Sequence, residues 1–491
     1  MNTPHNNAEM TILSNNNLTA LQKVMWGLVV LTLPVTSFRY IPTFFGASSI
    51  RPLAIYPLAI LMLLFGIQII KTRRVELPKI SSPLAAFFLV AAIATLIGFL
   101  YDPLVLRGQT SAGRAVRAWF SIAIGMAFFI SAYWMNKNAE DVKHTLKWMY
   151  VGLGASVIWG GIQIVVNELS FLDINLIENI QLLFSQRGLP DNGRIVGFAF
   201  EPAWFADQIV ILYYPWLFAA ILTDYRIFKY RWVEPILFLL GGVMLVFTFS
   251  RGGILIGLIA VLATALITSR KQLGVLWIWL LSPFNKTDNK QPALRPGVIR
   301  VTFITAVLLV VFSAGTVLSQ NKYFSSILEF DSATDVYSYV IDASAGSRLA
   351  FAISGLNVYA DYPWTGVGLG ASALYLYDYL PDWALSELPE INRKLSPDSK
   401  VVSNVKNLYV RLLAETGIIG FWFFVAFFLG VLAEIRQLYI SNKAIARYVA
   451  IAGLFIWIAV ALRNFTQDSL TFPIMWTGIG IVLGISSGQK S

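Results

Sequence analysis

Long uninterrupted apolar runs constrain this chain more than any other feature of its sequence. Of its 491 residues, 57% are hydrophobic and only 13% are charged, whereas a soluble domain is typically about a quarter charged. A water-soluble fold of this size could not bury so many apolar side chains, but the hydrocarbon core of a bilayer can surround them. The sequence therefore predicts an all-α polytopic membrane protein.

About twelve runs are long enough to cross a bilayer, which takes roughly 20 apolar residues in a helix. Their centres lie near Val29, Leu61, Ala92, Ile124, Ala155, Leu212, Gly242, Ile259, Leu309, Ala426, Ile456 and Ile479. The run from Pro235 to Ile267 is too long for one crossing, and the polar segment Ser250–Gly253 interrupts it. This interruption predicts a tight hairpin with Arg251 at its tip.

The order of the runs predicts four segments. Residues 1–20 form a cytoplasmic N-terminal tail, 21–319 hold the first nine spans, 320–403 form a large extracytoplasmic loop, and 404–491 hold the last three spans. An even number of spans places both termini on one side, and the modest excess of Lys and Arg on that side predicts that it is cytoplasmic. Because structureless loops of that length are uncommon, we expect residues 320–403 to fold as a cap on the outer face.

Charge and residue usage exclude several kinds of site. The net charge is +10, but the basic residues lie mostly in short loops, which is typical of topology signals and contact with anionic membrane lipid rather than of nucleic-acid binding. The chain has no cysteine and only two histidines, His5 and His144, so we expect neither a metal site nor a cofactor. The predicted short outer loops contain arginine but no lysine, which suits phosphate recognition, although chance and helix capping explain it equally well.

Four stretches on the predicted outer face carry candidate chemistry. In Gly193–Pro202, Arg194 could bind an anion and Glu201 could act as a general base, although Glu201 and Pro202 also read as an ordinary helix start. In Ser250–Gly253, a turn explains the glycines, but Arg251 is costly within so long an apolar run unless it faces a cavity or a partner.

The other two stretches lie later in the chain. Arg348 precedes Gly366–Gly370, whose glycines could form a backbone nest for an anion or simply a tight loop. The last stretch predicts one polar stripe on a helix, made of Asn404, Asn407, Arg411 and Glu415 at spacings of three and four. Arg411 and Glu415 could pair with each other, but a polar stripe that enters a membrane normally faces a water-filled cavity or a binding site.

In this order, the four stretches resemble the O-antigen polymerase and ligase family. The matching segments are Arg194–Pro202, Ser250–Gly253, Arg348–Gly370 and Asn407–Gly420. The resemblance implies a GT-C-like helical scaffold in the bacterial inner (plasma) membrane that transfers a glycan from undecaprenyl pyrophosphate on the periplasmic face without a metal. By motif position it implies that Arg194 and Arg348 hold the pyrophosphate. The remaining candidates, predicted to bind substrate, are Arg251, Lys406, Asn407, Arg411 and Glu415.

Ligase members of the family carry a histidine immediately before the asparagine of the last motif, and Lys406 holds that position here. Since His5 and His144 are predicted to be cytoplasmic, this departure favours a polymerase that joins lipid-linked repeat units, with Arg194, Arg348 and Glu201 as its catalytic residues. The resemblance also suggests a chain-length regulator and a flippase as partners. An O-antigen ligase is the first alternative. A membrane transporter is the second, although no internal repeat of the kind that transporters show is found.

Overall fold

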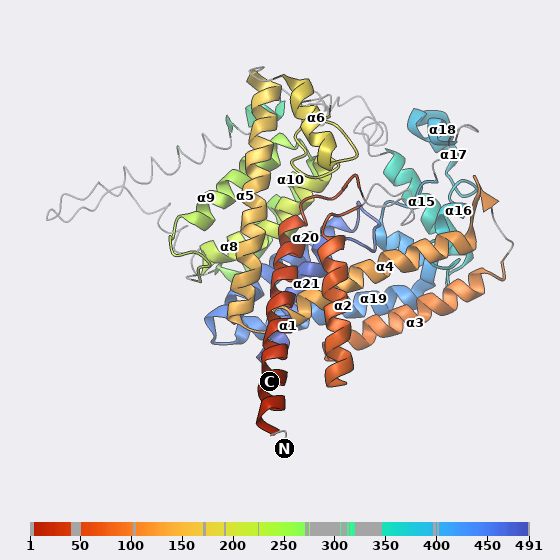
Figure 1. The fold of residues 1–491 in the computed structure, drawn as a ribbon. Helices are drawn as coiled ribbons and strands as arrows, with labels where there is room; N and C mark the ends of the chain where they lie inside the picture. Colours follow the sequence, from red (N-terminus) through yellow and green to blue (C-terminus); the bar gives the residue numbers. More distant parts are fainter. Residues whose placement is uncertain are drawn as a thin grey trace.

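The computed structural model describes residues 4–40, 51–101, 105–169, 173–190, 193–223, 225–270, 346–395 and 402–489, together with a few isolated positions. Apart from one small hairpin, this part of the chain is helical (Figure 1). Its elements are α1 (Pro4–Thr32), α2 (Ile55–Thr72), α3 (Ser81–Gly98), β1 (Val105–Leu106), β2 (Gln109–Thr110), α4 (Ser111–Trp134), α5 (Ala139–Leu169), α6 (Ile174–Phe184), α7 (Pro202–Asp207), the π-helix η2 (Gln208–Tyr213), α8 (Tyr214–Leu222), α9 (Val233–Phe247), α10 (Arg251–Thr268), α15 (Gly346–Asp361), α16 (Ser372–Tyr375), α17 (Asp382–Glu387), α18 (Pro389–Leu395), α19 (Leu408–Ile440), α20 (Ala444–Arg463) and α21 (Pro473–Gly488).

The chain is an all-α polytopic membrane protein, as its sequence predicts. Every predicted span centre falls inside a helix, except Leu309, which lies outside the described residues. Within the described residues, eight helices are long and apolar enough to cross a membrane, and α9 and α21 are shorter apolar helices. At the start of the chain, α1 begins at Pro4, so it includes most of the segment 1–20 as well as the first predicted span.

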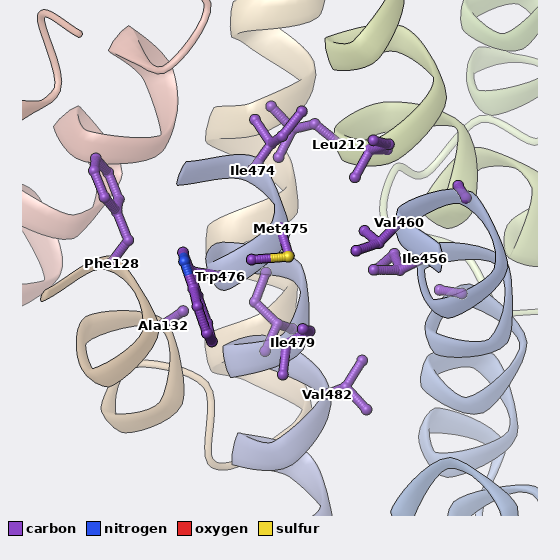
Figure 2. Close-up of a cluster of buried hydrophobic side chains, with 14 of the residues drawn as sticks. Phe128, Ala132, Leu212, Ile456, Val460, Ile474, Met475, Trp476, Ile479 and Val482 are labelled. Atoms are coloured by element: carbon purple, nitrogen blue, oxygen red, sulfur yellow. The ribbon is translucent and has the colours of Figure 1, made fainter. Parts of the chain in front are cut away.

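Small residues let α21 pack closely against α4 in the interior of the bundle. A Cβ atom added at Gly480 would lie 2.6 Å from the Phe129 carbonyl oxygen, and one at Gly484 would lie 2.5 Å from that of Asn136. Glycines four residues apart allow two helix backbones to approach, and close packing of this kind holds helices together where lipid is as apolar as the partner. Figure 2 shows α21 between α4, which carries Phe128 and Ala132, and α20, which carries Ile456 and Val460.

The predicted break in the long apolar run is confirmed, but the predicted tight hairpin is not. Helix α9 ends at Phe247 and α10 begins at Arg251, after Ser250 accepts a hydrogen bond from the Gly253 amide and caps the new helix. The two helices barely touch each other, because α9 packs against α8 and α5 while α10 packs against α20. Arg251 therefore begins a helix whose main packing partner differs from those of α9.

Helices α15 to α18 form a small cap within the segment predicted as a long loop. A core of its own, including Phe351, Leu376, Ile391 and Val405, is fully buried there. Figure 1 shows these helices at one end of α3, α4 and α19. We call this end of the bundle the site end; α1 and α20 end there, and α4, α7 and α19 begin there.

A backbone break in α19 fixes the cap to the bundle. Gly417 has φ 63° and ψ −172° inside the helix, a conformation that is essentially restricted to glycine. The break frees main-chain groups, and the cap segment pairs with them: the Ile418 amide donates to the Pro363 carbonyl at 2.9 Å, and the Val367 amide donates to the Ala414 carbonyl at 2.9 Å. The glycine of the Glu-x-Gly sequence is thus a docking point for the cap.

We predict that Gly417→Ala lowers the apparent melting temperature in detergent by several degrees. The new Cβ would lie 2.1 Å from the Trp364 carbonyl oxygen, and the backbone conformation alone costs about 1–3 kcal/mol for a residue with a side chain. Gly161→Ala on α5 is the matched control, since nothing lies within 4 Å of the added atom. Equal melting temperatures for the two variants would contradict this account of the break.

Candidate functional site

The first residues of α19 lie beside the loop that joins α20 to α21. Asn407 caps α19 by accepting a hydrogen bond from the Val410 amide. Arg411 and Glu415 pair at 3.1 Å, as one of the two readings of the sequence predicts, and Arg411 Nη1 also donates to the Asp468 carbonyl at 2.7 Å. Because Ser372 of the cap donates to Glu415 at 2.8 Å, these two charged residues also help to join α19, the α20–α21 loop and the cap.

The predicted polar stripe is only partly correct. Asn404 precedes the helix, and its side-chain oxygen accepts a hydrogen bond from Arg114 Nη2 at 2.6 Å. Helix α19 begins four residues later, at Leu408. Arg114 also donates from Nε to the Gly370 carbonyl at 2.7 Å, so it ties the beginning of α4 to the loop between α15 and α16 and to the segment before α19.

The glycines at 366–370 form a tight loop and do not offer a nest for an anion. The amides of Val367 and Gly368 donate to carbonyls of α19, and the Leu369 amide donates to the Thr95 hydroxyl at 3.2 Å. These amides are therefore already used within the protein. Of the two predicted alternatives, this segment is a tight loop and not an anion-binding nest.

Three cationic side chains gather where the cap meets the α20–α21 loop. Arg348 lies in the first turn of α15 and donates from Nη1 to the Thr466 carbonyl at 2.7 Å. Lys406 and Lys394 each place their ammonium nitrogen 5.7 Å from the centre of the Phe351 ring. Glu390 pairs with Lys394 and leaves the group with a net positive charge. We call these four charged residues, Arg348, Glu390, Lys394 and Lys406, the cationic cluster.

The cationic cluster changes the pKa of Lys406. Burial, together with the charges of Lys394 and Arg348, lowers the pKa of this ammonium to about 8, while Glu390 opposes the change. Burial acts against ionisation of Glu390, but hydrogen bonds from Lys394 and Ser347 outweigh it and hold the pKa of that carboxyl at about 2. In the absence of ligand, the pKa of Lys406 is therefore below its ordinary value. A bound anion would act in the opposite direction, because it would raise this pKa and relieve the repulsion between the cations.

The other predicted residues lie along the start of the span that begins at α7. Arg194 donates from Nε to the Thr248 carbonyl at 2.8 Å, beside the turn that precedes Arg251. Glu201 precedes α7 with its side chain 42% exposed and 3.8 Å from Arg187. A Cβ atom at Gly253 would lie 2.5 Å from the Ala206 side chain, so the turn before α10 contacts α7. Convergence of Arg194 with Arg348 on one ligand stays a prediction.

A buried ion pair that the motifs did not reveal connects α7 with α20. Arg463 Nε lies 2.8 Å from Asp207 Oδ1, and both side chains are less than 10% exposed. Arg463 Nη1 also donates to the Thr466 hydroxyl at 2.6 Å, and the charge of Arg348 acts on Asp207. The sequence signal was a lone aspartate inside an apolar span, which by itself indicates a polar partner or a functional site.

A cavity of about 180 Å³ lies next to this ion pair. Its polar wall contains Asp207, Gln208, Arg463 and Asp468, and its apolar wall contains Leu33, Pro52, Trp204, Phe472, Pro473 and Ile474. Asp468 also lies on the side of the cationic cluster, because its carboxylate accepts a hydrogen bond from the Lys406 amide at 3.3 Å. The α20–α21 loop is therefore a shared wall between the cluster and the cavity. Within the described ranges, no group of three or more potential metal-binding side chains occurs.

We predict that replacing only Asp207 destabilises the protein more than replacing both Asp207 and Arg463. Asp207→Leu leaves Arg463 buried without its carboxylate, which should cost about 3–5 kcal/mol. Replacing both residues, as Asp207→Leu with Arg463→Met, should restore much of the loss, as thermal unfolding in detergent can measure. A double variant whose loss equals the sum of the two single losses would contradict direct coupling.

Part of the second half of the chain is similar to a known protein family. Residues 236–425 match the family described as O-antigen ligase, and this range contains Arg251, the cationic cluster and the first residues of α19. The comparison with curated proteins gave no match. The match confirms the resemblance predicted from the sequence: over these residues the chain shares the characteristic sequence of the O-antigen polymerase and ligase family, a family of glycan-processing membrane enzymes.

Proposed function

We propose that the protein is an inner-membrane glycosyltransferase that polymerises undecaprenyl-pyrophosphate-linked oligosaccharide repeat units on the periplasmic face. The cationic cluster is the observation that carries this proposal, since a pyrophosphate is a compact anion that preorganised arginine and lysine side chains would neutralise. The cluster and the cavity lie together at the site end, which supports transfer between two bound ligands over transport along the bundle. A flippase would supply the substrate, and a chain-length regulator would limit its polymerisation.

In the proposed reaction, the oxygen of an acceptor hydroxyl bonds to the anomeric carbon of the donor sugar. The bond from that carbon to the pyrophosphate oxygen breaks, undecaprenyl pyrophosphate leaves with the electron pair, and the hydroxyl proton passes to a base. Because pyrophosphate is already a good leaving group, the main tasks of the protein are charge neutralisation and positioning. We assign the base to Glu201, whose side chain is half-exposed and remains accessible beside α7.

A ligase that transfers the glycan to a lipid A core or another acceptor is the second candidate. The pKa of Lys406, lowered to about 8, is the observation that favours it. Near neutral pH a fraction of this side chain is a neutral amine, and a neutral amine can accept a proton, as the histidine at this position is expected to do in ligases.

We predict that Arg194→Lys and Arg348→Lys each reduce polymer formation by at least tenfold. A lysine supplies the same charge as arginine but cannot bind two phosphate oxygens at once. The assay is the ladder of products that purified protein forms from lipid-linked oligosaccharide. Arg39→Lys is the matched control, because Arg39 also donates to a backbone carbonyl, that of Leu182, and has no proposed role. Full activity in both site variants would contradict bidentate recognition.

We predict that affinity for inorganic pyrophosphate falls as the pH rises through about 8. Lys406 carries its charge below its pKa of about 8 and loses that charge above it, so binding that depends on this charge weakens at high pH. Lys406→Arg should flatten the profile, since arginine stays protonated, and should retain substantial activity. Glu201→Gln, which removes the proposed base, should lower the turnover number more than it lowers the affinity for the lipid-linked substrate. Activity that instead rises through pH 8, with Lys406→Arg inactive, would make Lys406 the base and support the ligase.

A further inference from the structure

Gln208 lines the cavity next to the Asp207–Arg463 pair and carries a buried acceptor that has no hydrogen-bond partner within the described residues. Gln208 is 1% exposed, and its Nε2 donates to the Pro34 carbonyl at 2.9 Å, which fixes the orientation of the amide. Its Oε1 forms no hydrogen bond within the described residues. Leaving such an atom unsatisfied costs about 1–3 kcal/mol, so this oxygen is suited to receive a hydroxyl from a ligand.

The backbone around Gln208 is also unusual. The residues from Gln208 to Tyr213 form a π-helix, a rare conformation that often occurs at functional sites. It lies in the middle of the span from Pro202 to Leu222, and its first residue lines the cavity. The cavity wall is thus shaped by a conformation that an ordinary packed span does not require.

The chemistry of the walls favours an uncharged polyol over an anion. Asp207 neutralises Arg463, so this pair offers a phosphate no net positive charge, and Gln208 Oε1 is an acceptor, which suits a hydroxyl and not a phosphate oxygen. Trp204 and Phe472 supply aromatic surface for the apolar face of a ring. The cavity volume of about 180 Å³ is compatible with one sugar ring.

We propose that this cavity binds the terminal sugar ring of the acceptor glycan, with Gln208 Oε1 accepting a hydroxyl and Trp204 packing on the ring. This inference rests on the proposed function and adds the acceptor subsite to it. The position fits transfer, because the α20–α21 loop separates the cavity from the cationic cluster by a single wall. On the other side, Thr36 lines the cavity and accepts a hydrogen bond from the Phe200 amide, directly before Glu201.

The test measures two ligands separately on the full-length protein in detergent by titration calorimetry. The first is the repeat-unit oligosaccharide released from the host polysaccharide, free of lipid and phosphate, and the second is inorganic pyrophosphate. Gln208→Met should weaken oligosaccharide binding about three- to tenfold, as the loss of one hydrogen bond predicts. Trp204→Ala should weaken it at least tenfold, Trp204→Phe should restore most of it, and all three should leave pyrophosphate binding unchanged.

The matched control is Trp422→Ala, because Trp422 on α19 is 58% exposed and lines no part of the cavity. Oligosaccharide binding that survives both Gln208→Met and Trp204→Ala would overturn the proposal, as would a wild-type protein that binds pyrophosphate but not the oligosaccharide. Loss of pyrophosphate binding alone in these variants would instead assign the cavity to the lipid carrier. A wild-type protein that binds neither ligand would refute the proposed function itself.

Discussion

The buried pair of Asp207 and Arg463 determines where the other charged residues of the site can lie. Either charge alone would be very costly at the edge of the hydrocarbon region, so the beginning of the α7 span and the end of α20 have to meet. Once they meet, the α20–α21 loop has a fixed position. That loop then supplies the Thr466 carbonyl to Arg348, and Asp468 supplies its carbonyl to Arg411 and its carboxylate to the Lys406 amide. A single ion pair therefore positions cationic residues from two other segments of the chain.

The cap is held by main-chain hydrogen bonds, and this is important for how the cationic cluster works. A group of like charges repels itself, and a flexible segment would relieve the repulsion by moving the charges apart. Here the Gly417 break and the loop at 366–370 exchange backbone hydrogen bonds with each other, and Arg114 adds a bond from α4 to the Gly370 carbonyl. The fold thus keeps the cations close together although their repulsion lowers its stability. An anion that binds would find them already assembled, so no binding free energy would be lost in bringing them together.

Hydropathy predicts the spans because each helix must satisfy its own backbone in lipid, and the polar Ser250 marks the end of α9 correctly. Packing partners could not be predicted in the same way, since lipid and a neighbouring helix are equally apolar. Hydropathy therefore did not indicate that α10 packs mainly against α20 and only slightly against α9. The anion nest considered for Gly366–Gly370 is not formed for a related reason. Whether the amides near Gly368 are free depends on a break at Gly417, far along the chain. Likewise, the pKa of Lys406 depends on burial and on the charge of Lys394, which no local motif reports.

The distribution of charge across the α20–α21 loop suits a reaction between two different ligands. A glycosyl transfer brings an anionic donor and a neutral acceptor to one point, and a site that attracted both by charge would not keep them in order. On one side of this loop the cationic cluster has a net positive charge; on the other, Asp207 neutralises Arg463 beside the cavity. In the proposed reaction, electrostatics would therefore direct the pyrophosphate to the cluster and not to the cavity, where an uncharged ring could bind. The order of the two ligands would follow from the fold before any catalytic group acts.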